Sequence, residues 1–122
     1  MPLRKELGAM GEGLAKKFLE NLGYKIIAQN YKNYFGEMDI IAKEGDFFVF
    51  IEVKTRIAGG NWLPEESITR KKQERLIRIS NQYLIENKIE SENFRIDSVA
   101  IEIDRNTNQA KIRHLKNAVK YF

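Results

Sequence analysis

The chain has no cysteine and only one histidine among its 122 residues. Without cysteine it can form neither a disulfide framework nor a zinc or iron–sulfur site with cysteine ligands. Its longest apolar run covers only residues 47–51, whereas a membrane-spanning helix needs roughly 20 such residues. The first residues lack the apolar stretch of a signal peptide. These absences favour a cytoplasmic protein that does not enter a membrane.

The composition is that of a folded domain with a small positive charge. Hydrophobic residues make up 43% and charged residues 31% of the chain, which is typical of a globular protein. We predict one domain over residues 1–122, because the chain is short and has no linker or repeat. The net charge of +4 is compatible with an anionic partner such as nucleic acid, and equally with a solvated basic surface.

Hydrophobic periodicity predicts a helix, three strands, a second helix and two more strands. The first helix covers residues 4–22 and ends at Gly23, with an inner face of Leu7, Gly11, Leu14, Phe18 and Leu22. Thr69 can cap a second helix that ends at about residue 87 and buries Leu76, Ile79, Tyr83 and Leu84. Strands are predicted at 24–31, 38–43, 46–55, 94–103 and 110–115, with a loop at 57–64. This order predicts an α/β or α+β sheet with helices packed on it.

The strand over residues 46–55 is the most informative segment. Its apolar residues alternate onto both faces, which indicates a central strand that is covered on both sides. The strand nevertheless ends with Glu52 and Lys54, which share one face. Charged groups so close to a core are unfavourable unless they are paired or bound to a metal.

Asp39 is predicted to lie beside Glu52. A hairpin turn at about Glu44-Gly45 sets Asp39 opposite residue 50 or 51 of the next strand. Two neighbouring carboxylates repel each other unless a cation bridges them, and such oxygen ligands suit Mg²⁺ or Mn²⁺. Lys54 can orient an attacking water or stabilise negative charge on a phosphate. The same residues can instead form a salt-bridge cluster at the edge of the sheet.

Glu12 is the candidate for a third acid. It lies at the edge of the first helix's apolar stripe, next to small residues that allow a close approach to the sheet. It can also be an ordinary glutamate at the boundary of that stripe. Asp97 is expected to be a hydrogen-bonded structural acid, and His114 a structural or surface residue.

The beginning of the second helix is basic. Residues 69–78 have a net charge of +4, while residues 36–52 have a net charge of −4. The basic side chains can bind phosphate or form a solvated face, and they are Arg70, Lys71, Lys72, Arg75 and Arg78. Gln73 projects toward the apolar side, where it can contact the candidate site from behind its charged residues or bond to the backbone.

Three motifs together resemble the PD-(D/E)XK nuclease superfamily. They are Gly11-Glu12 on the first helix, the segment Gly36-Glu37-Met38-Asp39, and the strand end Glu52-Val53-Lys54. The chain is most similar to the YraN family of bacterial proteins, regarded as endonucleases from their fold and motifs, which resembles archaeal Holliday junction resolvases. The similarity covers nearly the whole chain. Met38 stands at a variable position where the superfamily's name has proline.

The resemblance implies a fold and a set of roles. The fold is a restriction-endonuclease-like core, a mixed sheet of four to five strands flanked by helices. Asp39 and Glu52 would be metal ligands, with Glu12 as a further acidic ligand and the Val53 carbonyl as another. Lys54 would position the attacking water.

The implied activity is that of a metal-dependent endonuclease that hydrolyses phosphodiester bonds in DNA, with branched or structured DNA as substrate. The expected cofactor is Mg²⁺ or Mn²⁺, and Arg56 and the basic helix would follow the phosphate backbone. Cutting two strands symmetrically would require a homodimer. The alternatives are a non-catalytic nucleic-acid-binding protein and an accessory subunit on the same fold.

Overall fold

The computed structural model describes residues 4–59, 69–89 and 93–119. Its elements, in chain order, are α1 (Arg4–Asn21), β1 (Lys25–Asn33), β2 (Gly36–Glu44), β3 (Phe47–Ile57), α2 (Arg70–Glu86), β4 (Phe94–Ile103) and β5 (Ala110–Leu115). The predicted order is confirmed. Of the loop predicted at 57–64, the first residue ends β3, and residues 60–64 lie outside the described part.

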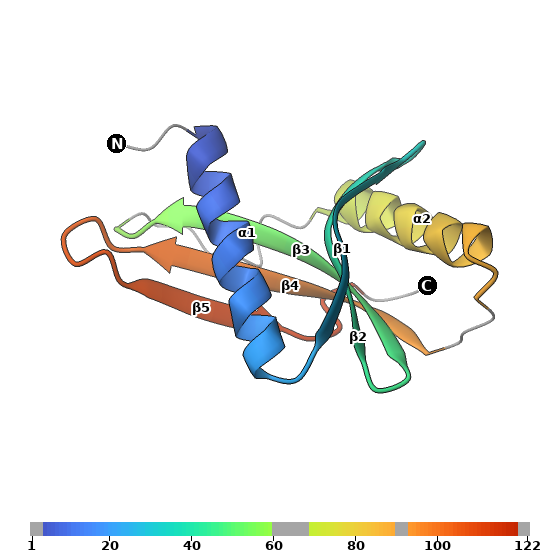
Figure 1. Cartoon of the computed structure of the whole chain (residues 1–122). Coiled ribbons are helices and arrows are strands. Elements are labelled where there is room, and N and C mark those ends of the chain that lie inside the picture. Colours follow the sequence, from blue (N-terminus) through green and yellow to red (C-terminus); the bar gives the residue numbers. More distant parts are fainter. Residues whose placement is uncertain (1–3, 60–68, 90–92, 120–122) are drawn as a thin grey trace.

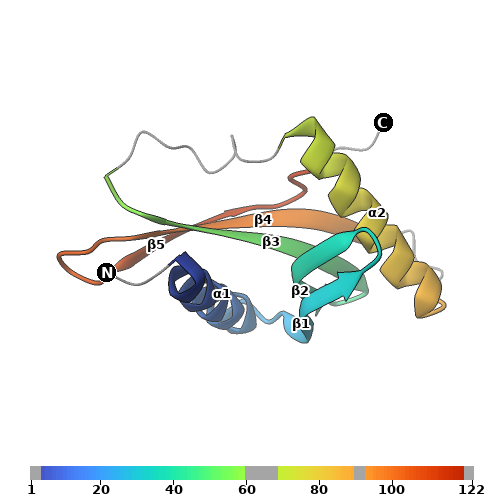
Figure 2. The ribbon, with the colours of Figure 1, turned by 90° about the horizontal axis from the view of Figure 1, so that it is seen from above.

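The five strands form one mixed sheet in the order β1-β2-β3-β4-β5. Only β3 and β4 run parallel, and α2 connects them along the chain (Figure 1). The two helices cover opposite faces of the sheet, as Figure 2 shows from above. This arrangement confirms the predicted α/β class and is consistent with a restriction-endonuclease-like core. Neither described helix is long and apolar enough to cross a bilayer.

The central strand β3 contributes to a hydrophobic core on each side of the sheet. Val49 and Ile51 are fully buried in the core under α1, while Phe50 is fully buried in the core under α2. Each such side chain stabilises the fold by about 1.5–3 kcal/mol relative to an exposed one. The prediction of a central strand covered on both faces is therefore confirmed.

Helix α1 packs the predicted face on the sheet except at Leu22: Gly11 is buried, and Leu7, Leu14 and Phe18 pack half-buried against the core. Ala15 and Leu19 are fully buried, whereas Leu22, assigned to the inner face, is 54% exposed. The reason is that the helix ends at Asn21, so Leu22 no longer follows the helical spacing. Gly23 then takes a φ of +94°, the left-handed conformation expected of a residue that ends a helix.

Helix α2 begins and packs as predicted. The side chain of Thr69 caps it by accepting a hydrogen bond from the Lys72 backbone N–H at 3.2 Å. The predicted inner face is buried against the sheet and consists of Leu76, Ile79, Tyr83 and Leu84. The cap fixes where the basic residues of the first turns emerge.

A buried ionic network holds the far edge of the sheet together. The fully buried Asp97 accepts hydrogen bonds from Arg95 Nε at 3.0 Å and from the Asn117 backbone N–H at 2.9 Å, and its Oδ2 lies 2.8 Å from His114 Nε2. Burial by itself raises the pKa of Asp97, but the bonds from His114, Asn117 and Arg95 outweigh it and hold the pKa below its ordinary value. The prediction that Asp97 is a hydrogen-bonded structural acid is confirmed.

Candidate active site

The candidate site lies where β3 leaves the two hydrophobic cores. Phe50 packs under α2 and Val53 packs against the core under α1, so alternation turns Glu52 and Lys54 toward the α2 face. Glu52, Val53 and Lys54 are only half-buried. The end of the central strand thus carries charged groups in a partly dehydrated position.

Asp39 lies beside this strand end, one step beyond the predicted register. Glu44 pairs with Phe47, which makes Gly45 and Asp46 the hairpin turn. When a two-residue turn moves by one position, every pairing in the hairpin shifts by two residues. In the observed register Ile40 lies opposite Ile51, which brings Asp39 level with Glu52. Asp39 Oδ2 then accepts a hydrogen bond of 2.7 Å from the Val53 backbone N–H. The prediction of residue 50 or 51 was wrong in register, but the expected proximity to Glu52 is present.

The environment of Asp39 disfavours its negative charge. The pKa of Asp39 is raised from an ordinary 3.8 to about 7. Burial is the largest cause, and the carboxylates of Glu12, Glu52 and Glu37 add to it, whereas the hydrogen bond from the Val53 backbone N–H lowers the pKa. Near neutral pH the side chain is therefore poised between its charged and neutral forms. A cation at this point would favour the charged form.

Glu52 makes an ion pair that the sequence did not predict. Its Oε1 lies 2.6 Å from Lys72 Nζ, and the two side chains are only 15% and 16% exposed. Its second oxygen, Oε2, is buried and has no hydrogen-bond partner in the described part of the chain. A buried carboxylate oxygen without a donor is unfavourable and offers a ligand position to a cation.

Lys54 lies in a position that favours its neutral form. Burial lowers its pKa, and the neighbouring cations Lys72 and Arg56 lower it further, while Glu52 opposes them. A lysine whose pKa is lowered gives up its proton more readily than an ordinary lysine, which is the direction that a general base needs. Lys54 can thus act on a water or a developing charge at the same strand end.

Helix α1 brings Glu12 to the site through a close contact with β3. A Cβ at position 11 would overlap the Thr55 side chain, so only Gly11 permits this approach. Glu12, the next residue, is half-buried, and burial raises its pKa with a further contribution from Glu37. The expectation that small residues let α1 deliver an acid to the sheet agrees with this geometry.

Two residues of the site were missed in the sequence, Asn30 and Glu37. With its amide nitrogen facing the carboxylates, Asn30 donates to Glu12 Oε1 at 2.8 Å and to Glu37 Oε1 at 3.0 Å. Asn30 takes a φ of +52°, a left-handed conformation that asparagine tolerates better than most residues. Glu37 belongs to the motif that contains Asp39, which was the available signal. Asn30 lies seven residues before Glu37, and no spacing in the sequence linked its side chain to the acids.

A small cavity opens between α1 and the end of β3. Its volume is about 280 Å³, and its walls are formed by Leu7, Gly8, Glu12, Val53, Lys54, Thr55 and Arg56. The cavity therefore brings together a predicted acid, the predicted carbonyl ligand Val53, the candidate lysine and Arg56.

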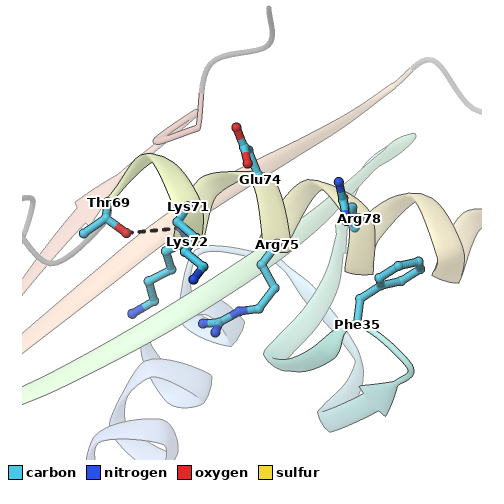
Figure 3. A pocket seen from close by; sticks show the side chains of 7 residues that line it. All are labelled: Phe35, Thr69, Lys71, Lys72, Glu74, Arg75 and Arg78. Carbon is cyan, nitrogen blue, oxygen red and sulfur yellow. Dashed lines mark hydrogen bonds between the residues drawn. The ribbon is translucent and has the colours of Figure 1, made fainter.

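The basic residues of α2 line a second, larger hollow next to the acids. Its volume is about 540 Å³, and its walls are formed by Phe35, Thr69, Lys71, Lys72, Glu74, Arg75 and Arg78 (Figure 3). Arg70 does not line it and lies 3.8 Å from Glu74 in an exposed pair. Gln73 is half-buried, and its backbone N–H donates to the Thr69 carbonyl at 2.9 Å. Its role behind the charged residues stays a prediction.

The donor set of the site fits a hard divalent cation. Asp39, Glu52 and Glu12 offer carboxylate oxygens, and the unpartnered Glu52 Oε2 is an open ligand position. Across residues 4–59, 69–89 and 93–119, no group of three or more acids, histidines or cysteines is already arranged around one ion position. A cation would therefore have to draw these side chains together.

Among solved structures, the chain is similar to that of Pyrococcus furiosus SfsA in complex with Ca²⁺. The sequences are 12% identical, and the match covers 93% of this chain and 63% of the other, with a TM-score of 0.40. A likeness of this size supports no conclusion about function.

Sequence relatives define the family. Residues 11–101 match the profile described as "Uncharacterised protein family UPF0102". UPF0102 proteins of Alkaliphilus oremlandii and Clostridium beijerinckii are 41% and 35% identical, over 95% and 97% of this chain and 99% and 96% of their own lengths. A UPF0102 protein of Desulfitobacterium hafniense is 48% identical over 80% of this chain and 82% of its own. The chain therefore belongs to the UPF0102 (YraN) family, as its motifs implied.

Proposed function

We propose that the protein is a metal-dependent endonuclease that hydrolyses phosphodiester bonds in DNA. The observation that carries this proposal is the pairing of two opposite pKa shifts at one strand end. Asp39 has a raised pKa of about 7 among other acids, and Lys54 has a lowered pKa beside them. An acid with a raised pKa next to a base with a lowered pKa is typical of catalytic acid–base sites.

Mg²⁺ or Mn²⁺ would be held by Asp39, Glu52 and the Val53 carbonyl, with Glu12 as a further ligand. When bound, such a cation supplies positive charge to a phosphate and lowers the pKa of water. The repulsion among the carboxylates and the open Glu52 Oε2 support this assignment.

The protein's own side chains would position the other reactants. Lys54 Nζ would hold the attacking water, and its lowered pKa makes it a better proton acceptor site than an ordinary lysine at the same pH, since less of its population is protonated. Arg56 lines the same cavity as Lys54 and would contact a neighbouring phosphate. Gln73 would support these groups from the first turn of α2.

The basic side chains of α2 would follow the DNA backbone away from the cut. Those that line the larger hollow are Lys71, Lys72, Arg75 and Arg78, and Arg70 would contribute from outside it. Branched or structured DNA is the proposed substrate, and a homodimer would place two such sites for cutting both strands.

One observation favours a different function. Lys72 already neutralises Glu52 at 2.6 Å, so the acids can be stable without a metal. A nucleic-acid-binding protein without catalytic activity, or an accessory subunit activated by a partner, would need no more than this.

A cleavage assay separates these functions. The protein is incubated with linear and branched DNA in Mn²⁺, Mg²⁺ or EDTA, and the cleavage rates are compared with those of Asp39→Asn and Lys54→Met. We expect cleavage that requires the metal and a loss of about 10²–10⁴-fold in each variant. The matched controls are Asp46→Asn and Lys25→Met, which change exposed residues away from the site.

The opposite result identifies the alternative. If the protein binds DNA in both metals without cutting it, and Asp39→Asn binds equally well, the endonuclease proposal is wrong and the binding function holds.

A further inference from the structure

We propose that the hollow of Figure 3 is a binding site for an unpaired nucleotide, whose base stacks on Tyr34. The inference rests on the proposed function because it names the substrate class: DNA with single-stranded bases close to the scissile bond. Neither Tyr34 nor Phe35 is a predicted site residue, and both lie in the turn between β1 and β2.

The hollow has the charge that a DNA backbone requires. Its volume of about 540 Å³ falls in the range of small-molecule pockets, and four of its seven lining residues are basic against one acid. Figure 3 shows Lys71, Lys72 and Arg75 extending to the same side of α2, whereas Glu74 points away from it. The described residues contain no ion pair to Lys71, Arg75 or Arg78, and all three are exposed. These cations are available to phosphate groups.

An aromatic pair lies at the other end of this hollow. Phe35 lines it and is half-buried, while its neighbour Tyr34 is 95% exposed. The two rings have centroids 5.4 Å apart and are inclined at 85°, so Phe35 supports the edge of Tyr34 and leaves the tyrosine ring accessible. Aromatic rings that flank a basic groove are the usual stacking surfaces for single-stranded nucleic acid.

The turn that carries the aromatic pair is anchored on α2. Asn33 Nδ2 donates to the Ile79 carbonyl at 3.2 Å, and Asn33 Oδ1 accepts from the Phe35 backbone N–H at 2.9 Å. Gly36 follows with a φ of +145°, and a Cβ there would lie 3.1 Å from Ile79 Cδ1. The backbone that carries Tyr34 is thus held against the basic helix, so little additional ordering of the turn is needed when a base binds.

The hollow leads directly from the candidate active site. Lys72 lines it and also contacts Glu52, at 2.6 Å. From Lys72 to Arg78 the helix rises by about 9 Å. A stacked strand advances by about 3.4 Å per nucleotide, so this distance corresponds to two to three nucleotides. The base at the aromatic pair would therefore lie about two to three nucleotides from the scissile phosphate.

Stacking on Tyr34 requires a base whose face is open. Inside a duplex, both faces of each base are covered by its neighbours, and unstacking a paired base costs a few kcal/mol. A single strand, a flap or the branch point of a junction presents such a face without that cost. The geometry thus favours DNA with unpaired bases over an intact duplex.

The test measures binding without cleavage. Fluorescence anisotropy in EDTA gives the Kd for a labelled oligothymidine, a duplex with a single-stranded flap and a blunt duplex. The variants are Tyr34→Ala, Tyr34→Phe, Arg75→Gln and, as a control at an exposed apolar residue elsewhere, Leu22→Ala. Because Tyr34 is almost fully exposed, circular dichroism is expected to show an unchanged fold in both of its variants.

We expect Tyr34→Ala to weaken binding of oligothymidine and flap roughly 5- to 150-fold, the range that corresponds to loss of one stacked base. Its affinity for the blunt duplex is expected to change less than about twofold, since phosphate contacts dominate there. Tyr34→Phe keeps the ring and Leu22→Ala lies elsewhere, so both are expected to bind like the parent protein. Arg75→Gln is expected to weaken binding of all three DNAs.

The outcomes separate this inference from the proposed function. If Tyr34→Ala weakens no DNA while Arg75→Gln weakens all, the stacking site is wrong and the endonuclease proposal is untouched. If the Tyr34 dependence is observed but the cleavage assay finds no cutting, the stacking site stands and the endonuclease proposal fails. A parent protein that binds none of the three DNAs overturns both.

Discussion

Two aspartates on the same sheet, the fully buried Asp97 and the half-buried Asp39, have opposite environments. Asp97 accepts bonds from Arg95 and Asn117 and contacts His114, and its pKa lies below the ordinary value. Asp39 accepts a hydrogen bond from the Val53 backbone N–H and has three carboxylates around it, which together with burial raise its pKa to about 7. The first environment is complete in the folded chain, whereas the second disfavours the charged form of its aspartate.

The difference shows how one fold uses buried charge for two purposes. Around Asp97 the donors come from β4, β5 and the turn after β5, so the network ties separate segments together. Around Asp39, acids from α1, β2 and β3 approach one another at a net cost in free energy. Such repulsion persists only because the rest of the fold holds the acids in place, and perturbed carboxylates of this kind are common at functional sites.

The largest effect is expected from removing the Asp97 carboxylate, which has hydrogen-bond partners within the folded chain. Asp97→Asn leaves the Arg95 guanidinium and the His114 ring without their shared partner, and we expect the free energy of unfolding to fall by about 3–5 kcal/mol. At pH 8, Asp39→Asn is expected to raise the free energy of unfolding. The amide can keep the hydrogen bond to the Val53 backbone, while the repulsion from the neighbouring carboxylates is lost. Urea denaturation measures both. A larger loss in Asp39→Asn than in Asp97→Asn would contradict the comparison.

The two aspartates are also expected to give opposite pH dependences. The pKa of Asp39 is raised on folding, so the folded state holds the extra proton and stability is lost as the pH rises from about 4 to about 7. The slope from one such group is at most about 1.4 kcal/mol per pH unit. The lowered pKa of Asp97 means that its contribution is lost only as the pH falls below the ordinary aspartate value.

The difference in unfolding free energy between the parent protein and Asp39→Asn isolates the first slope. We expect this difference to vary between pH 4 and pH 7 and to be constant above that range. A difference that stays constant from pH 4 to pH 8 would mean that Asp39 has an ordinary pKa.

The smallest effect concerns the metal. Mn²⁺ at about 100 times its Kd is expected to stabilise the parent protein by about 2.7 kcal/mol at pH 8, because it binds only the folded acids. Asp39→Asn and Glu52→Gln are expected to lose this stabilisation, while Asp46→Asn, in the exposed hairpin turn, keeps it. Equal stabilisation of all four proteins, measured by thermal unfolding, would place the metal elsewhere.

Local patterns in the sequence were enough to predict the secondary structure and the principal acids. The alternation of apolar residues in β3 gave its central position, because a strand covered on both faces must be apolar on both. The register of Asp39 was less certain. One residue in the position of the hairpin turn moves a pairing by two, and turn residues such as Glu44, Gly45 and Asp46 fit either position.

Long-range pairing could not be predicted in the same way. The bond between Lys72 and Glu52 joins residues 20 positions apart, and that between Asn30 and Glu12 joins an edge strand to a helix. Neither has a spacing that local periodicity can reveal, since both depend on how α1 and α2 pack on the sheet. The same holds for the proposed role of Tyr34, which depends on the basic helix that lies beside its turn.

The sequence by itself determined the order of elements, the family and the acids and lysine at the strand end, because each leaves a mark within a few neighbouring residues. Only the tertiary structure decided the charge states of those residues and their partners. The pKa of Asp39 reflects burial and three other carboxylates, and that of Lys54 reflects burial and two other cations. Electrostatic energies depend on distances through space and on exposure to water, and both are set when the helices pack onto the two faces of the sheet.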